Sequence, residues 1–167
     1  MRSIRYCAMA LAGATALMGA GSAVAGTASS TIAISATVSA NCTVTTAAIA
    51  FGTYNTLSAA NSDATGTVNV TCTPGTPWTA TAGAGTGTGA TLSVRKMTSG
   101  ANLMNYALYT DSGRTTIWGD GVAPTVNIAG TGTGAVQAST IYGRVTGSQS
   151  TLPVGSYADT VAVTITF

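Results

Sequence analysis

Few residues of this sequence could carry chemistry, and two cysteines are the first to consider. Cys42 and Cys72 are the only cysteines after residue 25. An even number of cysteines in an exported chain favours a disulfide, and closing a loop of this length is worth roughly 3.5 kcal/mol in the chain-entropy model. The alternative, two free thiols that bind a metal or act as a redox pair, lacks both Cys-x-x-Cys spacing and any histidine. We therefore predict a disulfide between Cys42 and Cys72.

The composition leaves little from which to build a catalytic site. The chain contains no histidine and no glutamate, so Ser-His-Asp, Cys-His and His-metal constellations are excluded. A pair of catalytic carboxylates would need two of the four aspartates, but three of these lie beside turn residues and the fourth opens a strand. A serine paired with Lys96 would be a further possibility, but the adjacent Arg95 and Lys96 are typical of a solvated strand end. We expect no enzyme activity and no cofactor. The four aspartates are Asp63, Asp111, Asp120 and Asp159.

Sites for small ligands are also weakly indicated. Neither Asp111 nor Asp120 belongs to the run of alternating oxygen ligands that a calcium loop needs, and we expect no metal site. The glycine-spaced stretch 83–89 lacks the lysine and the following helix of a phosphate-binding loop, so we expect a mobile surface loop. Trp78, Trp118 and the tyrosines could form a carbohydrate-binding surface. In a small sandwich, however, such residues are more often core or loop anchors.

The first residues have the pattern of a targeting signal. Arg2 and Arg5 precede an apolar run from Tyr6 to about Val24, which closes on the small residues Ala23 and Ala25. We predict a signal peptide over residues 1–25 and export through the periplasm. A transmembrane helix is a weaker interpretation because the run is short, contains glycines and has no basic flank behind it. Cys7 precedes most of the apolar run and is therefore no lipid-attachment site.

After residue 25 the charges balance. The four basic residues equal the four aspartates in number, so the net charge is zero. There is therefore no electrostatic case for binding nucleic acid or anionic lipid. A charge-poor surface protects poorly against association. That is a defect in a free monomer but tolerable in a subunit that polymerises. The basic residues are Arg95, Lys96, Arg114 and Arg144.

The elements that would position these residues are strands, because apolar residues recur at every second position. Two segments alternate most regularly, residues 31–38 and residues 159–167, and each places four apolar side chains on one face. Further strands are expected at 67–72, 78–81, 91–95, 104–109 and 140–145, with a short strand or arm at 49–54 and a turn at 130–134. No helical period is sustained, so we predict an all-β sandwich over residues 39–167. The two apolar rows are Ile32, Ile34, Ala36 and Val38, and Val161, Val163, Ile165 and Phe167.

Seven motifs are spread over the same part of the chain. They are Asn41-Cys42-Thr43-Val44, Phe51-Gly52-Thr53-Tyr54, Val70-Thr71-Cys72, the stretch 104–109, Trp118-Gly119-Asp120-Gly121, Tyr142-Gly143-Arg144 and the stretch 155–167. Together they closely resemble the spore coat protein U domain family, which includes the major pilins of archaic (Csu-type) chaperone-usher pili. The resemblance implies an incomplete immunoglobulin-like sandwich that lacks its last strand. In such a subunit a periplasmic chaperone supplies the strand first, and the N-terminal strand of the next identical or homologous subunit replaces it after delivery to an outer-membrane usher.

The residues themselves agree with this implication. The strand at 159–167 ends the sequence and needs a partner on its far edge, and an added strand is a known mode of recognition. Residues 31–40 contain no glycine, asparagine, aspartate or proline at which the chain could reverse. We therefore predict that residues 26–38 form a donor strand for another subunit of a cell-surface fibre. The alternative is that residues 31–38 are the first strand of a closed sandwich, in a monomeric secreted coat or adhesive protein.

Overall fold

The computed structural model describes residues 24–167, and most of the predicted signal peptide, residues 1–25, lies outside that range. The chain divides into two units, residues 1–36 and residues 37–167. The described part of the first unit, residues 24–36, contains neither helix nor strand. Its apolar side chains are open to solvent, with Ile32 87% and Ile34 92% exposed.

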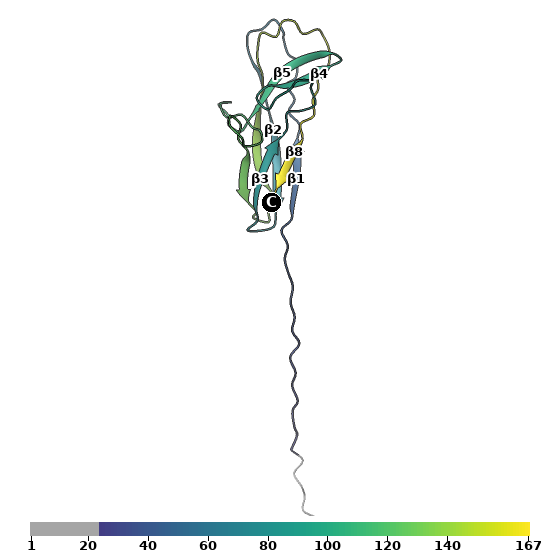
Figure 1. The fold of residues 1–167 in the computed structure, drawn as a ribbon, viewed down its shortest axis with the longest axis vertical. Coiled ribbons are helices and arrows are strands. Elements are labelled where there is room, and N and C mark those ends of the chain that lie inside the picture. The colour runs from purple at the N-terminus through teal and green to yellow at the C-terminus, as the bar shows by residue number, and fades with distance from the viewer. Residues whose placement is uncertain (1–23) are drawn as a thin grey trace, which may run out of the picture. The chain divides into compact units, whose positions relative to one another are not determined.

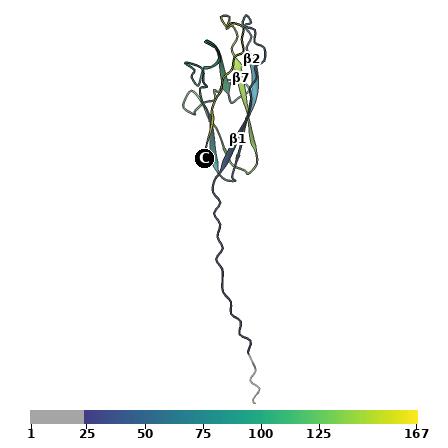
Figure 2. The same ribbon diagram turned by 90° about the vertical axis from the view of Figure 1, so that its right-hand side faces the viewer.

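The second unit is built from two antiparallel sheets (Figures 1 and 2). The larger sheet has the order β1-β2-β7-β5-β4, and Figure 2 shows its first three strands side by side. The smaller sheet has the order β6-β3-β8. The larger sheet consists of β1 (Cys42–Ala47), β2 (Ser62–Cys72), β7 (Gln137–Val145), β5 (Asn102–Tyr109) and β4 (Arg95–Ser99), and the smaller sheet consists of β6 (Ile128–Thr131), β3 (Pro77–Ala82) and β8 (Val163–Thr166).

The core lies between the two sheets. It is filled by every second side chain along the strands, those that point inward. Trp118, in the loop between β5 and β6, is 2% exposed, and its indole N–H donates a hydrogen bond to the carbonyl of Ala80 in β3 at 3.2 Å. Residues 24–167 contain no helix, which confirms the predicted all-β fold, and hence none that could cross a membrane. Other core side chains are those of Val68, Val70, Trp78, Tyr106, Leu108, Ile141 and Val145.

Two expected elements are placed differently in the structure. The predicted strand at 91–95 is a loop, and β4 begins only at Arg95. The predicted turn at 130–134 overlaps β6, which contains Gly130. A Cβ atom at Gly130 would lie 2.5 Å from the Trp78 ring, so glycine is needed here for close packing of the neighbouring strand rather than for a turn.

Candidate functional site

The candidate site is an open groove of about 490 Å³ between the end of β1 and the segment that leads into β8. One rim consists of residues 46–49 and Phe51, and the other of residues 157–161 and Val163. The floor is apolar, and it is formed by core residues of the larger sheet and of the loop after β5. The main floor residues are Val68, Leu108, Trp118 and Ile141.

Each rim adjoins a strand at the edge of a sheet, since Thr46 and Ala47 belong to β1 and Val163 belongs to β8. β1 pairs with β2, and β8 pairs with β3, but within residues 24–167 neither strand has a partner on its other side. Each strand therefore offers a row of backbone N–H and C=O groups to an added strand. β1 and β8 are neighbours in the sandwich, as can be followed in Figure 1. The groove lies at the end of β1 and beside the segment that leads into β8.

The structure places three residues of the predicted C-terminal row against the core, and two of them, Val161 and Val163, also line the groove. Val161, Val163 and Ile165 are half-buried and pack against the core cluster. Phe167 is 55% exposed and is absent from that cluster, so the row is only partly buried. The reason is that pairing between β8 and β3 ends at Thr166.

The last strand is also shorter than the sequence predicts, because the chain changes sheets on the way to it. Ala158 and Thr98 exchange two backbone hydrogen bonds, of 2.8 and 3.1 Å, beside the larger sheet. Four residues later the carbonyl of Ala162 accepts a hydrogen bond from Gly83 N–H at 2.9 Å, next to the smaller sheet. Residues 159–162 therefore cross between sheets, and β8 begins at Val163 rather than at Asp159.

The predicted donor residues are all exposed, and the structure brings them to no partner. Ala36 is exposed like Ile32 and Ile34, and Val38, the only one of the four in the second unit, is 83% exposed. Their role as a donor strand stays a prediction.

Asp159 carries the densest set of hydrogen bonds at the groove. Its Oδ1 accepts from the backbone N–H of Thr86 at 2.7 Å, from the Thr86 hydroxyl at 2.8 Å and from the backbone N–H of Thr160 at 2.8 Å. Its Oδ2 accepts from the Tyr106 hydroxyl at 2.6 Å. Burial opposes ionisation of this carboxyl, but the hydrogen bonds from Tyr106 and Thr86 outweigh it, so the pKa of Asp159 is lowered.

The loop that supplies Thr86 is the glycine-spaced stretch 83–89, which we expected to be a mobile surface loop. Instead it packs closely on its neighbours. A Cβ atom at Gly85, whose φ is +89°, would collide with the Asp159 carboxylate, and one at Gly87 would collide with the Lys96 backbone. The glycines therefore allow close contact with the groove rim.

Arg95 lies behind this loop and is fully buried, which contradicts the expected solvated strand end. Its guanidinium donates to four backbone carbonyls, those of Gly83 at 2.9 Å, Leu92 at 2.8 Å, Trp118 at 2.8 Å and Ala82 at 3.5 Å. Burial lowers the pKa of Arg95, whereas Tyr106 and Asp159 nearby oppose that shift. No sequence pattern revealed this arrangement, because its acceptors are backbone groups of three separate segments, at 82–83, at Leu92 and at Trp118.

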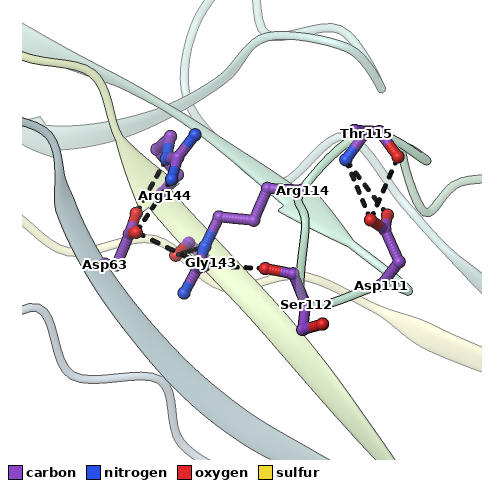
Figure 3. Close-up of polar contacts among 7 residues, drawn as sticks. All are labelled: Asp63, Asp111, Ser112, Arg114, Thr115, Gly143 and Arg144. Carbon is purple, nitrogen blue, oxygen red and sulfur yellow. Dashed lines mark hydrogen bonds and ion pairs between the residues drawn. The ribbon is translucent and has the colours of Figure 1, made fainter.

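A second polar cluster, shown in Figure 3, lies away from the groove. Asp63 accepts two hydrogen bonds from Arg144, of 2.8 and 2.9 Å, and forms an ion pair with Arg114 at 3.3 Å. The hydrogen bond from Arg144 is the main cause of the lowered pKa of Asp63. Asp111, also drawn there, accepts from the backbone N–H groups of Thr115 and Thr116 and so fixes a turn. Among residues 24–167, no three potential ligands of the His, Cys, Asp or Glu types come together as a metal site.

The predicted disulfide between Cys42 and Cys72 is present in the structure. The two residues are directly opposite each other in the β1–β2 pairing, and the bond fixes the first residue of β1 to the last residue of β2. It therefore holds in place the edge strand that forms one rim of the groove.

Comparison with known proteins identifies the family. The model of the Spore Coat Protein U domain matches residues 28–164. The chain belongs to this family. The match begins before Ile32, so the domain pattern includes the exposed N-terminal segment as well as the sandwich. None of the curated proteins matches the sequence.

The fold of this family member is also similar to a solved structure. That structure is a pre-assembly complex of the CsuC chaperone and the CsuE tip adhesion subunit, from archaic chaperone-usher Csu pili of Acinetobacter baumannii. The matched chain of the complex is 20% identical, with a TM-score of 0.59. The alignment covers 78% of the present chain but 40% of the matched one, so the present chain spans less than half of that neighbour.

Loss of the disulfide should destabilise the domain. We expect Cys42→Ser to lower the free energy of unfolding by roughly 3.5 kcal/mol, because the unfolded chain regains the entropy of an open loop. Denaturant unfolding of the exported protein, compared with the reduced and alkylated wild type, measures this effect. Two free thiols found by mass spectrometry in the native exported protein would contradict the disulfide.

Below about pH 8, the stability of the domain should depend on pH only under acidic conditions. All four aspartates have a folded-state pKa below their ordinary value of 3.8. Their stabilisation is therefore complete above that value and is lost as the pH falls through the lower folded-state pKa. Since the chain has no histidine or glutamate, we expect a flat profile from about pH 5 to about pH 8 and a decrease below about pH 4. Urea unfolding at a series of pH values tests this, and a transition near neutral pH would contradict it.

Proposed function

We propose that the chain is a structural subunit of an extracellular chaperone-usher pilus, and that it polymerises by donor-strand complementation. The observation that carries the proposal is the open apolar groove between two strands with free edges. In this proposal residues 1–25 are the signal peptide, residues 26–38 the donor strand and residues 39–167 the accepting sandwich. A periplasmic chaperone first fills the groove with one of its own strands. After delivery to an outer-membrane usher, the donor strand of the next subunit replaces the chaperone strand and fills the groove permanently.

The donor segment has the chemistry that the groove requires. Ile32 and Ile34 expose nearly their whole side chains in the chain alone. Burying two isoleucines and their smaller neighbours is worth on the order of 5 kcal/mol. Each new ladder hydrogen bond adds about 0.5 to 1.5 kcal/mol. Such a junction between subunits is long-lived, as a surface fibre requires. The corresponding roles of the fibre are surface adhesion and biofilm formation.

The second candidate is a monomeric secreted coat or adhesive protein with the same sandwich. The family takes its name from a coat protein, which keeps this candidate in view. Its weakness is that it leaves both the groove and the row of Ile32, Ile34, Ala36 and Val38 without cover. Electrophoresis of surface extracts without boiling distinguishes the two, because a polymer gives a ladder and a monomer gives one band.

Donation by the N-terminal segment is tested by charge placed on either face of the proposed strand. We expect Ile34→Asp to abolish fibres because it places an unpaired charge in the groove. Ser35→Asp should leave fibres intact, because successive side chains of a strand point to opposite faces. Deletion of Thr27 to Ala36 should also abolish fibres while leaving a chaperone-bound domain. Electron microscopy of cells that carry the chaperone and usher is the measurement, and normal fibres from the deletion variant would refute donation between subunits.

Capture by the chaperone should depend on the C-terminal strand. Phe167 is half-exposed at the end of β8, where a chaperone strand would add to the open edge and bury it. We expect Phe167→Ala, or a short tag after Phe167, to reduce the amount of chaperone that co-purifies with the subunit. Val154→Ala is the control, since Val154 is an exposed loop residue outside β8 and the groove lining. Unchanged co-purification with both Phe167 variants would contradict this assignment.

A further inference from the structure

We propose that Asp159 is a positioning residue of the groove, which together with Thr86 and Tyr106 fixes one rim and so sets how long an inserted strand stays bound. This inference rests on the proposed function, because it concerns the residence time of the donor strand in that groove.

The need for a positioning residue follows from the backbone of the rim. Asp159, Thr160 and Val161 all line the groove. Within residues 24–167, their backbone groups form no hydrogen bond with other backbone groups, whereas Ala158 and Ala162 on either side do. This part of the rim therefore has no ladder of its own to hold it in place. Apart from the Thr160 N–H, which donates to the Asp159 carboxylate, its N–H and C=O groups are free for an added strand. The bonds that do hold this part of the rim are those of the Asp159 side chain.

Those bonds connect the rim to two other parts of the domain. Through Tyr106 they reach β5, whose inner face is part of the groove floor. Through Thr86 they reach the loop 83–89, and Gly83 of that loop accepts from the buried Arg95. Arg95 donates in turn to the carbonyl of Trp118, which also belongs to the floor. Rim and floor are thus linked by two routes that meet at Asp159.

This geometry has a consequence for an inserted strand. A ladder hydrogen bond weakens steeply when its donor and acceptor are misaligned, so a strand can form its full set of bonds only if the rim stays at a fixed distance from the floor. When the hydrogen bonds of Asp159 to Thr86 and Tyr106 are lost, an incoming donor strand must order the rim as it binds. Because that ordering weakens binding, the bound strand is released sooner.

The test measures release of a donor peptide from the mature chain, residues 26–167. The chain is refolded with a fluorescent peptide of residues 27–38, and the purified complex is then chased with unlabelled peptide. We expect Asp159→Asn to release the peptide about tenfold faster than wild type, from the loss of charge-assisted hydrogen bonds. Thr86→Val, which removes only the hydroxyl bond of an exposed residue outside the groove lining, should release it several-fold faster.

Two variants separate positioning from general destabilisation. Thr86→Ser keeps the hydroxyl and should restore release to within about twofold of wild type. Asp111→Asn also removes a carboxylate that accepts from backbone N–H groups and a threonine hydroxyl, but it lies outside the groove lining. It should leave the release rate unchanged.

The outcomes distinguish the two proposals. If wild type captures the peptide but Thr86→Val releases it at the wild-type rate, the positioning role is refuted and the proposed function stands. An equal acceleration by Thr86→Ser and Thr86→Val refutes it in the same way, as does an acceleration by Asp111→Asn as large as that by Thr86→Val. If wild type neither captures the peptide nor assembles through its own N-terminal segments, the proposed function itself is overturned.

Discussion

The constraint on which the whole structure depends is that, within residues 24–167, β1 and β8 are edge strands, each paired on one side only. Each strand is bonded on one side, by β2 and by β3 respectively. Backbone polar groups need partners once they are buried, and apolar side chains need cover. A further strand between β1 and β8 would satisfy both requirements at once. The groove lies beside these two edge strands, and its floor is formed by core residues.

The charged side chains of the domain act through local hydrogen bonds and ion pairs rather than through a long-range electrostatic field. Each of the four aspartates accepts from groups nearby, and for each the result is a lowered pKa. Asp111 and Asp120 fix loops, and Asp63 joins β2 to β7 through Arg144. Asp159 differs because it lies at the groove. Its position explains why a chain with so few charges places one of them beside an apolar cleft, where desolvation opposes ionisation.

Much of the fold could be predicted from the sequence, because alternation reports which face of a strand is buried. The strands that contain residues 67–72, 104–109 and 140–145 were expected for that reason. The features that were missed depend on contacts between distant segments. Residue 130 of β6 is a glycine because the Trp78 ring occupies the space that a side chain would need. Arg95 is buried because carbonyls of three other segments accept its hydrogen bonds. The role of Asp159 likewise needs Thr86 and Tyr106, which are 73 and 53 residues away in the chain.

The start of β1 shows how the chain enters the sandwich. Asn41 extends the pairing of β1 with β2 by one residue, since its carbonyl accepts from Thr73 N–H at 2.9 Å and its own N–H donates to the Thr73 hydroxyl. The only potential turn residue near this point is thus already committed to extended structure. The apolar row of even-numbered residues from Ile32 to Val38 is in phase with Cys42 and Val44 of β1. Because a reversal needs a turn and a slip of one residue would exchange the two faces, this unbroken phase supports the proposal that residues 26–38 form a donor strand for another subunit.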